Sequence, residues 1–248
     1  MSTLNADAIL KEKFEAIKTS ILDPKGTGMH VIDNKIIFQQ IPALGQTPPW
    51  SKMIYGPKNP AGEQVAGYTD IADSGCGLCS LAAPLRMLTK NNSINPGMLA
   101  RKYGKYHVKD VGSKFTLMTE VPIDFGCMGQ EIPLKKDIFT RCLDEGKYIV
   151  IVGKTIPPFY GEGHFVYIRS YDDMTDAFSI GNSYPIGAGV YDFIKPYTWE
   201  MLTSKPGLVA AWAIYNINPK NLSATRPLKT NNLGYSFTGK VKPGWHPY

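Results

Sequence analysis

One cysteine of this chain stands where a reactive thiol is easiest to arrange. Cys76 lies in the segment Ser-Gly-Cys-Gly-Leu-Cys-Ser-Leu-Ala, residues 74–82, and apolar residues follow it at helical spacing. Asp73 or Ser74 can cap the start of that helix, so Cys76 is expected in its first turn. Unpaired backbone N–H groups and the helix dipole at this position favour the thiolate, which is the nucleophilic form of cysteine.

The residues on either side of Cys76 support a reactive role. Gly75 and Gly77 are expected to leave room for a substrate to reach the thiol. The alternative is a small buried cysteine in a core helix, which is the more common use of a free cysteine. The choice between the two interpretations therefore depends on whether the chain provides catalytic partners for Cys76 elsewhere.

A cysteine nucleophile needs a base that takes its proton and a third group that orients the base. His164 opens the alternating run His-Phe-Val-Tyr-Ile, which is typical of a strand. Folding the predicted hairpin about Asp173 brings Asn182 roughly opposite His164, with a register that could slip by one or two residues. Asparagine there would orient the imidazole and fix its tautomer. In isolation, His164 also fits a purely structural role.

The remaining histidines and cysteines are weaker candidates. Polar partners at comparable geometry are not evident for the other three histidines, His30, His107 and His246. Cys76 and Cys79 form a Cys-x-x-Cys, which also occurs in zinc sites and thioredoxin-like redox sites. A zinc site needs a second closely spaced pair, whereas Cys127 and Cys142 stand apart in apolar surroundings, and no βαβ pattern surrounds the motif. We therefore expect no metal and no cofactor, and Cys79 either packs in the core or traps Cys76 by oxidation.

The order of the predicted elements indicates the α+β class, in which helices come first and an antiparallel sheet follows. A helix at 5–22 carries the apolar stripe Leu10, Phe14, Ile17 and Ile21 and is expected to dock on the rest of the chain. A strand at 30–42 precedes a Gly- and Pro-rich loop at 45–67. The Cys76 helix should run to about Lys90, kinked or shortened by Pro84. Further helices are expected at 95–103 and 134–145, and further strands at 147–153, 164–171, 177–182 and 208–217.

Composition places limits on location and partners. The chain has 248 residues, of which 43% are hydrophobic and 19% charged, as in soluble globular proteins. No run approaches the roughly 18–20 apolar residues that span a bilayer, and no signal peptide is evident, so synthesis in the cytoplasm is expected. The net charge is +6, and residues 218–248 are basic without an acidic residue. Such a tail either contacts an anionic polymer or is simply solvated; nucleic acid is not the expected partner.

Cysteine, histidine and asparagine in this order resemble papain-like cysteine peptidases. The sequence is more closely similar to the branch of bacteriocin-processing (double-glycine leader) peptidases and their stand-alone relatives in bacteria and phages. The matching motifs are Gln46-Thr-Pro-Pro-Trp50, Tyr55-Gly56, Gly75-Cys-Gly-Leu-Cys-Ser-Leu-Ala82 and Gly163-His-Phe-Val166. The resemblance implies a papain-like fold in which a helical part with the nucleophile packs on an antiparallel sheet with the histidine and asparagine. It divides the chain into an N-terminal extension at 1–37, a peptidase domain at 38–217 and a tail at 218–248.

The resemblance also implies roles for four residues. Cys76 would be the nucleophile, His164 the general base and acid, and Asn182 the orienting residue. Gln46 would donate to the oxyanion beside the Cys76 N–H. This chain departs from the branch in having asparagine in place of the usual aspartate and proline at Pro84. Gln46 also lies far upstream of Cys76, and Asp70 occupies the place of a closer glutamine.

The implied activity is cleavage of a peptide-type bond by a thiol hydrolase. A peptidoglycan stem peptide or cross-bridge is the expected substrate, because the stand-alone relatives are phage or bacterial wall lysins. The basic tail, with its aromatic residues, would then grip a wall polymer, and the enzyme would act from a phage particle or after release by a holin. Two alternatives are a protease that cuts leader peptides and a non-catalytic virion or effector protein with the same fold.

Overall fold

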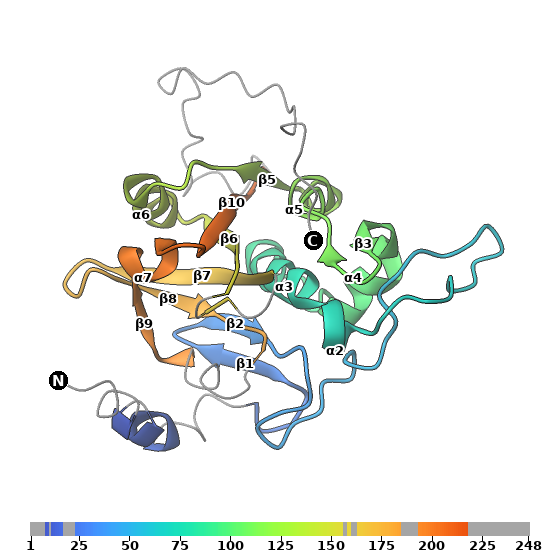
Figure 1. The fold of residues 1–248 in the computed structure, drawn as a ribbon, viewed down its shortest axis with the longest axis horizontal. Coiled ribbons are helices and arrows are strands. Elements are labelled where there is room, and N and C mark those ends of the chain that lie inside the picture. Colours follow the sequence, from blue (N-terminus) through green and yellow to red (C-terminus); the bar gives the residue numbers. More distant parts are fainter. Residues whose placement is uncertain are drawn as a thin grey trace.

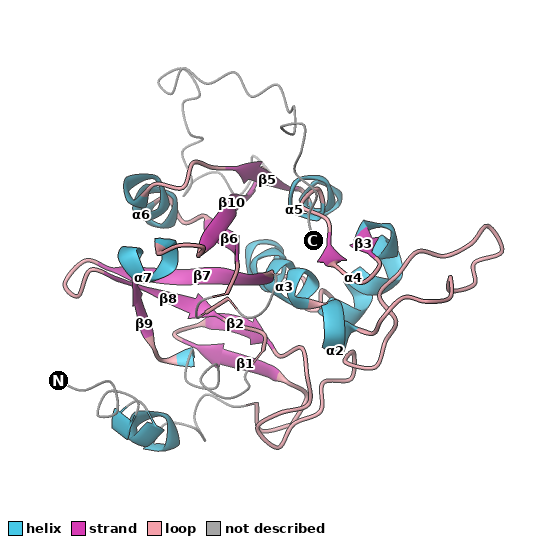
Figure 2. Ribbon diagram, in the orientation of Figure 1, coloured by secondary structure: helices cyan, strands magenta, loops and turns pink. Residues whose placement is uncertain are grey.

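A six-stranded antiparallel sheet forms the centre of the fold, with helices packed on both of its faces (Figures 1 and 2). The computed structural model describes residues 8–9, 11–16, 23–155, 158–159, 163–184 and 193–217. Helices together with an antiparallel sheet confirm the predicted α+β class. The 218–248 tail lies outside the described residues.

The strands lie in the order β5-β10-β6-β7-β8-β9, and each neighbouring pair is antiparallel. Four of them confirm predicted strands to within one residue at each end: β6 (Tyr148–Gly153), β7 (His164–Asp172), β8 (Ala177–Gly181) and β10 (Leu208–Asn216). The sequence did not predict the other two, β5 (Cys127–Glu131) and β9 (Pro196–Thr198).

The main helices are α2 (Ile71–Ser74), α3 (Cys76–Thr89), α4 (Pro96–Tyr103), α5 (Leu117–Glu120), α6 (Lys136–Asp144) and α7 (Trp199–Thr203). Two short 3₁₀ turns accompany them, η1 (Gly104–Tyr106) and η2 (Val121–Phe125), and a two-stranded ribbon is formed by β3 (His107–Val108) and β4 (Gly112–Ser113). The helix predicted at 95–103 is confirmed as α4, with Pro96 in its first turn and the Asn95 side chain accepting from the Met98 N–H. None of the described helices is long and apolar enough to cross a membrane.

Side chains of the central strands alternate between two cores. Phe165 and Tyr167 of β7 belong to the cluster that contains α3, whereas Val166 and Ile168 belong to a cluster with Phe139 of α6. Because both faces of the sheet are covered, β6 reads as a continuous apolar run instead of an alternating pattern. The sheet is therefore the wall against which the helix of Cys76 is fixed.

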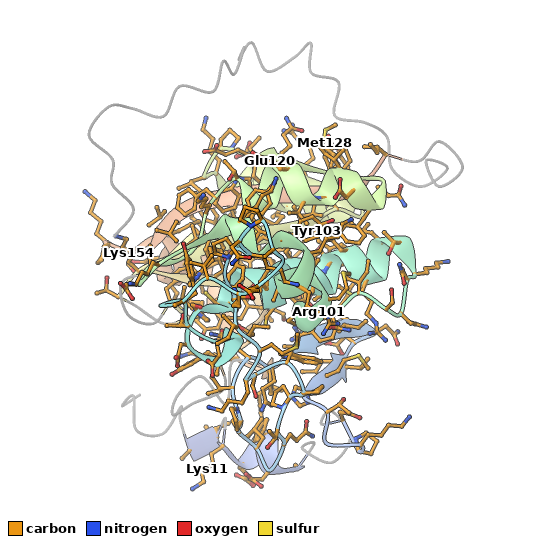
Figure 3. The ribbon with its side chains drawn as sticks, turned by 90° about the vertical axis from the view of Figure 1, so that its right-hand side faces the viewer. Lys11, Arg101, Tyr103, Glu120, Met128 and Lys154 are labelled. Atoms are coloured by element: carbon orange, nitrogen blue, oxygen red, sulfur yellow. The ribbon has the colours of Figure 1, made fainter. Side chains whose placement is uncertain are left out.

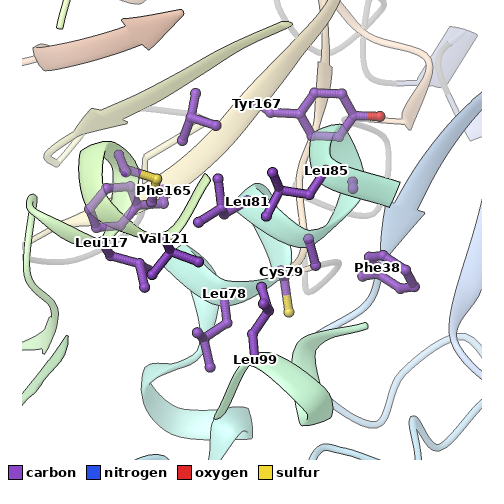
Figure 4. Packing of buried hydrophobic residues seen from close by; sticks show 14 of the residues in the cluster. Phe38, Leu78, Cys79, Leu81, Leu85, Leu99, Leu117, Val121, Phe165 and Tyr167 are labelled. Carbon is purple, nitrogen blue, oxygen red and sulfur yellow. The ribbon is translucent and has the colours of Figure 1, made fainter. Parts of the chain in front are cut away.

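Helix α3 is held by burial along its whole inner side (Figure 4). Leu78, Leu81 and Leu85 are each 0% exposed and pack in the larger core. The helix runs through Pro84 to Thr89, so the expected shortening at this proline does not occur. Packing of this face outweighs the loss of one backbone hydrogen bond.

The strand predicted at 30–42 is instead a hairpin. β1 (Met29–Ile32) pairs with β2 (Lys35–Phe38), and the turn residues Asp33 and Asn34 have φ of 50° and 59°. Positive φ at both central residues gives the tight turn that matches the twist of paired strands, and Asn and Asp tolerate it better than most residues. The prediction of one long strand was wrong because it passed over this turn.

A buried arginine joins the hairpin to the sheet. Arg169 of β7 is 4% exposed, and its Nη1 donates to the Ile32 carbonyl oxygen at 3.4 Å and to the Asp33 carboxylate at 3.2 Å. Its Nε and Nη2 donate to the carbonyl oxygens of Ile180 and Phe193 at 2.9 and 2.8 Å. One side chain thus connects three segments of the chain.

The described part of the N-terminal helix also packs on the main core. Residues 8–9 and 11–16 are helical, and Phe14 is 1% exposed with its ring centroid 6.3 Å from that of Phe193. Docking on the rest of the chain is therefore confirmed for Phe14. The other stripe residues, Leu10, Ile17 and Ile21, lie outside the described residues.

On the side of the molecule that Figure 3 shows, α4 and η1 are fastened to α5 and η2. The Tyr103 hydroxyl donates to the Asp124 carboxylate at 2.8 Å, and the Tyr106 hydroxyl donates to the Glu120 carboxylate at 2.5 Å. These two bonds hold together the helices and 3₁₀ turns that pack on α3 opposite the sheet.

Candidate functional site

Cys76 is the first residue of α3, as predicted, and its side chain is partly exposed. The other three cysteines are buried. The cap differs from the expectation, because Gly75 is the N-cap and provides no side-chain bond. Ser74 belongs to α2, and its hydroxyl donates to the Asp70 carbonyl oxygen at 3.1 Å. The helix start therefore presents backbone N–H groups without a competing side chain.

The two glycines beside Cys76 serve packing. A Cβ on Gly75 would lie 2.3 Å from the Cγ2 atom of Ile71, and a Cβ on Gly77 would lie 2.4 Å from the Oγ atom of Ser113. The expectation that they leave room for a substrate was wrong, because neighbouring side chains already fill that space. Their small size lets α2 and β4 come close to the turn that carries the thiol.

Opposing effects act on the Cys76 thiol. Desolvation of the thiol by the surrounding residues raises its pKa. The backbone N–H groups of Phe165, Gly77 and Cys76 itself favour the thiolate and lower the pKa. Burial is the larger effect, so the pKa is raised and the resting side chain is a thiol. The thiolate-favouring N–H groups were predicted, but the net shift has the opposite sign.

His164 and Asn182 meet directly. The His164 Nε2 atom lies 2.8 Å from the Asn182 Oδ1 atom, and the two residues are 5% and 0% exposed. Strand β7 pairs with β8 through Tyr167 opposite Gly181, after an irregularity between Ile168 and Ser170. Continuing that register displaces the predicted pairing by two residues, so the two side chains meet across a diagonal of the sheet.

The hydrogen bonds of Asn182 define the tautomer of the imidazole. The Tyr184 backbone N–H donates to the same Oδ1 atom at 2.9 Å, which identifies that atom as the carbonyl oxygen of the amide. An oxygen acceptor requires a hydrogen on His164 Nε2, so the neutral ring carries its basic lone pair on Nδ1. The Tyr184 ring lies edge-on to His164, with centroids 6.1 Å apart.

Burial lowers the pKa of His164 to about 4, and the bond to Asn182 only partly opposes this shift. The ring is therefore neutral at neutral pH. A neutral imidazole with its lone pair on Nδ1 is the form that a general base requires.

Phe165 connects the histidine to the thiol. It follows His164 directly in β7, its N–H faces the sulfur of Cys76, and its carbonyl oxygen accepts from the Ser80 hydroxyl at 3.0 Å. The first turn of α3 therefore lies against the start of β7. Cys76, His164 and Asn182 are thus brought to one end of the sheet from distant parts of the chain.

The structure gives Gln46 different neighbours. Its Oε1 atom accepts from the Gly28 N–H at 3.0 Å, and its Nε2 donates to the Asp23 carbonyl oxygen at 2.8 Å. This amide ties together the loop before β1, and neither of these two bonds involves Cys76. Asp70, which stands closer in sequence, caps α2 by accepting from the Asp73 N–H at 3.1 Å.

Sequence reasoning missed Gln40, which lies just after β2. It is 2% exposed, and its Nε2 donates to the Ala72 carbonyl oxygen at 2.9 Å. Its Oε1 accepts from the Ser183 hydroxyl at 3.2 Å, and its N–H donates to the Ser183 carbonyl oxygen at 2.7 Å. Ser183 directly follows Asn182, so Gln40 reaches both sides of the site.

Of the other histidines, His30 and His107 have neighbours different from those of His164. His30 does have a polar partner, contrary to the expectation, since its Nε2 lies 2.9 Å from the Gln39 Oε1 atom. His107 is buried between the rings of Tyr55 and Tyr68, and among the described residues neither of its nitrogens has a hydrogen-bond partner. His246 lies outside the described residues.

In the described part of the chain, no group of three His, Cys, Asp or Glu side chains is arranged to hold a metal ion. No protein-family model, curated protein or solved structure matches the chain.

The lowered pKa of His164 predicts a loss of stability in mild acid. The unfolded chain takes up a proton at this residue near pH 6.5 and the folded chain near pH 4, so the unfolded state binds more protons in between. The free energy of unfolding should fall from pH 6.5 towards pH 4, with about 3 kcal/mol due to His164. Urea unfolding at several pH values should show a smaller loss in His164→Gln. An identical loss in this variant would contradict the assignment.

Proposed function

We propose that this chain is a papain-like cysteine peptidase or amidase with Cys76 as nucleophile, His164 as general base and acid, and Asn182 as orienting residue. The observation that carries the proposal is the buried His164–Asn182 bond beside a helix-initial thiol. A structural histidine would need a hydrogen-bond partner, but it would not need a cysteine at the start of the helix packed against its strand.

The chemistry follows from the protonation states. Both groups are neutral at rest, so the proton passes from the thiol to His164 Nδ1 as the sulfur attacks the carbonyl carbon. The Nε2–Asn182 bond keeps the ring aligned while it carries a positive charge. The imidazolium then gives its proton to the leaving amine, and a thioester remains on Cys76.

The second half of the reaction uses water. His164 takes a proton from a water molecule as the water oxygen attacks the thioester carbon. The carbon–sulfur bond then breaks, the acid product leaves, and the imidazolium returns its proton to the Cys76 sulfur. The N–H groups near the sulfur, those of Phe165, Gly77 and Cys76, supply fixed positive dipoles where negative charge develops. The Cys76 N–H is the donor that we assign to the oxyanion, and the contacts of Gln46 lead us to leave that residue out.

The substrate that we propose is a peptide-type bond of bacterial peptidoglycan. This choice is supported by the sequence resemblance to stand-alone phage and bacterial lysins, in the motifs around Cys76 and His164. It would make the protein a wall hydrolase that acts on a stem peptide or cross-bridge.

Iodoacetamide tests the nucleophile without a substrate. We expect Cys76 to be alkylated first at neutral pH, and His164→Ala to slow this reaction about tenfold because the thiol loses its base. The measurement is the rate of carbamidomethylation of each cysteine by peptide mass spectrometry.

Selective alkylation of Cys76 is not sufficient evidence for the proposed pair, because burial alone protects Cys79, Cys127 and Cys142. The dependence on His164 is the decisive result, and an unchanged Cys76 rate in His164→Ala would contradict the proposed pair. A variant that unfolds would reveal itself through alkylation of the other three cysteines.

Purified sacculi test the substrate. The parent protein should release soluble peptide fragments, and Cys76→Ala, which removes only the sulfur, should release none above the buffer control. Equal release by both proteins would eliminate Cys76 as nucleophile. Absence of release by a parent protein that passes the alkylation test would eliminate the wall substrate while leaving the thiol chemistry intact.

A further inference from the structure

Gln40 contacts both halves of the proposed site. One half is the turn after β8, where Asn182 holds the imidazole, and the other is the pair of helices α2 and α3 that carries the thiol. Gln40 is bonded twice to Ser183 in the first half and once to Ala72 in the second. These contacts join segments 143 and 32 positions away from it in sequence.

Burial makes these bonds selective for one geometry. Gln40 is 2% exposed and Ser183 also 2%, so an amide or hydroxyl that lost its partner here would not regain one from bulk water. Leaving a buried polar group unpaired costs about 1–3 kcal/mol. The distance between the Asn182 turn and α2 is therefore limited to values that satisfy both ends of the Gln40 amide.

The helix end of the contact lies directly before the nucleophile. Ala72 is in α2, whose last turn leads through Gly75 into Cys76, and the Gly75 N–H donates to the Ile71 carbonyl oxygen at 2.8 Å. Movement of α2 would thus move the first turn of α3. The Ala72 N–H is held as well, by the Ser51 carbonyl oxygen at 2.9 Å.

We propose that Gln40 is a positioning residue that sets the placement of the imidazole relative to the Cys76 thiol by fixing the Asn182–Ser183 turn to helix α2. It acts through Asn182 and His164 and does not itself touch the reacting atoms. The inference rests on the proposed function, because it gives Gln40 a role in the same thiol–imidazole pair.

The test is the rate of Cys76 alkylation by iodoacetamide as a function of pH. Gln40→Ala should lower the rate at pH 7 about tenfold, towards that of His164→Ala. The double variant should be no slower than His164→Ala alone, because residues that act through one another have non-additive effects. A purely structural role would not produce this non-additivity.

Gln39→Ala is the matched control. Gln39 is also a buried glutamine, at 0% exposed, but its Nε2 donates to the carbonyl oxygens of Ile41 and Ala43 in the following loop. Its removal should leave the Cys76 rate within about twofold of the parent. If Gln40→Ala fails to fold, as seen from alkylation of all four cysteines, Ser183→Ala removes one bond of the same contact and should slow Cys76 about threefold.

Each outcome decides between the proposals. Parent-like alkylation of Gln40→Ala, or of Ser183→Ala where that variant takes its place, would overturn the positioning role. So would a double variant slower than His164→Ala by the full Gln40→Ala factor. If His164→Ala itself does not slow Cys76, the proposed catalytic pair fails instead, and the two failures are thereby distinguished.

Discussion

The fold depends on the packing of one helix against one strand, α3 on β7. The apolar side of α3 is completely buried, and the Ser80 hydroxyl fastens the helix to the Phe165 carbonyl oxygen. This contact fixes where the helix begins relative to the strand, and both elements begin with a residue of the proposed site. Any arrangement that kept the core but slid α3 by one turn along β7 would separate Cys76 from His164.

Burial gives this site its electrostatic character. A thiol at a helix start in water would be acidified by the backbone N–H groups, but here burial raises the pKa of Cys76 and lowers that of His164. Both effects favour the neutral pair over the ion pair. In the proposed reaction, charge separation would then have to be stabilised, and the Asn182 bond and the N–H groups around the sulfur would provide that stabilisation.

Local sequence patterns predicted much of the fold and part of the site. Apolar runs and alternation gave β6, β7, β8 and β10, and Asn95-Pro96 marked the start of α4. Strand β5 gave no such signal, because its Gly129 is required by the close approach of the Met118 carbonyl oxygen, a contact that only the tertiary structure reveals. For the same reason, the contacts of Gln40 could not be predicted, because its partners are distant in the chain and belong to no sequence motif. The proximity of His164 and Asn182 could be predicted because a hairpin joins them, although the irregularity in β7 changed the register of the pairing.

The buried guanidinium of Arg169, in the second half of β7, and the imidazole of His164, at its start, respond differently to acid. Arg169 contacts the β1–β2 hairpin through the Ile32 carbonyl oxygen and the Asp33 carboxylate, and its other two bonds go to the carbonyl oxygens of Ile180 and Phe193. Neither an arginine nor a carbonyl group gains or loses a proton as the solution is acidified. His164, at the beginning of the same strand, must accept charge in a dry environment. Acidification should therefore loosen the part of the sheet that holds His164 first, while the bonds from Arg169 to carbonyl oxygens persist, which would make the change local and reversible.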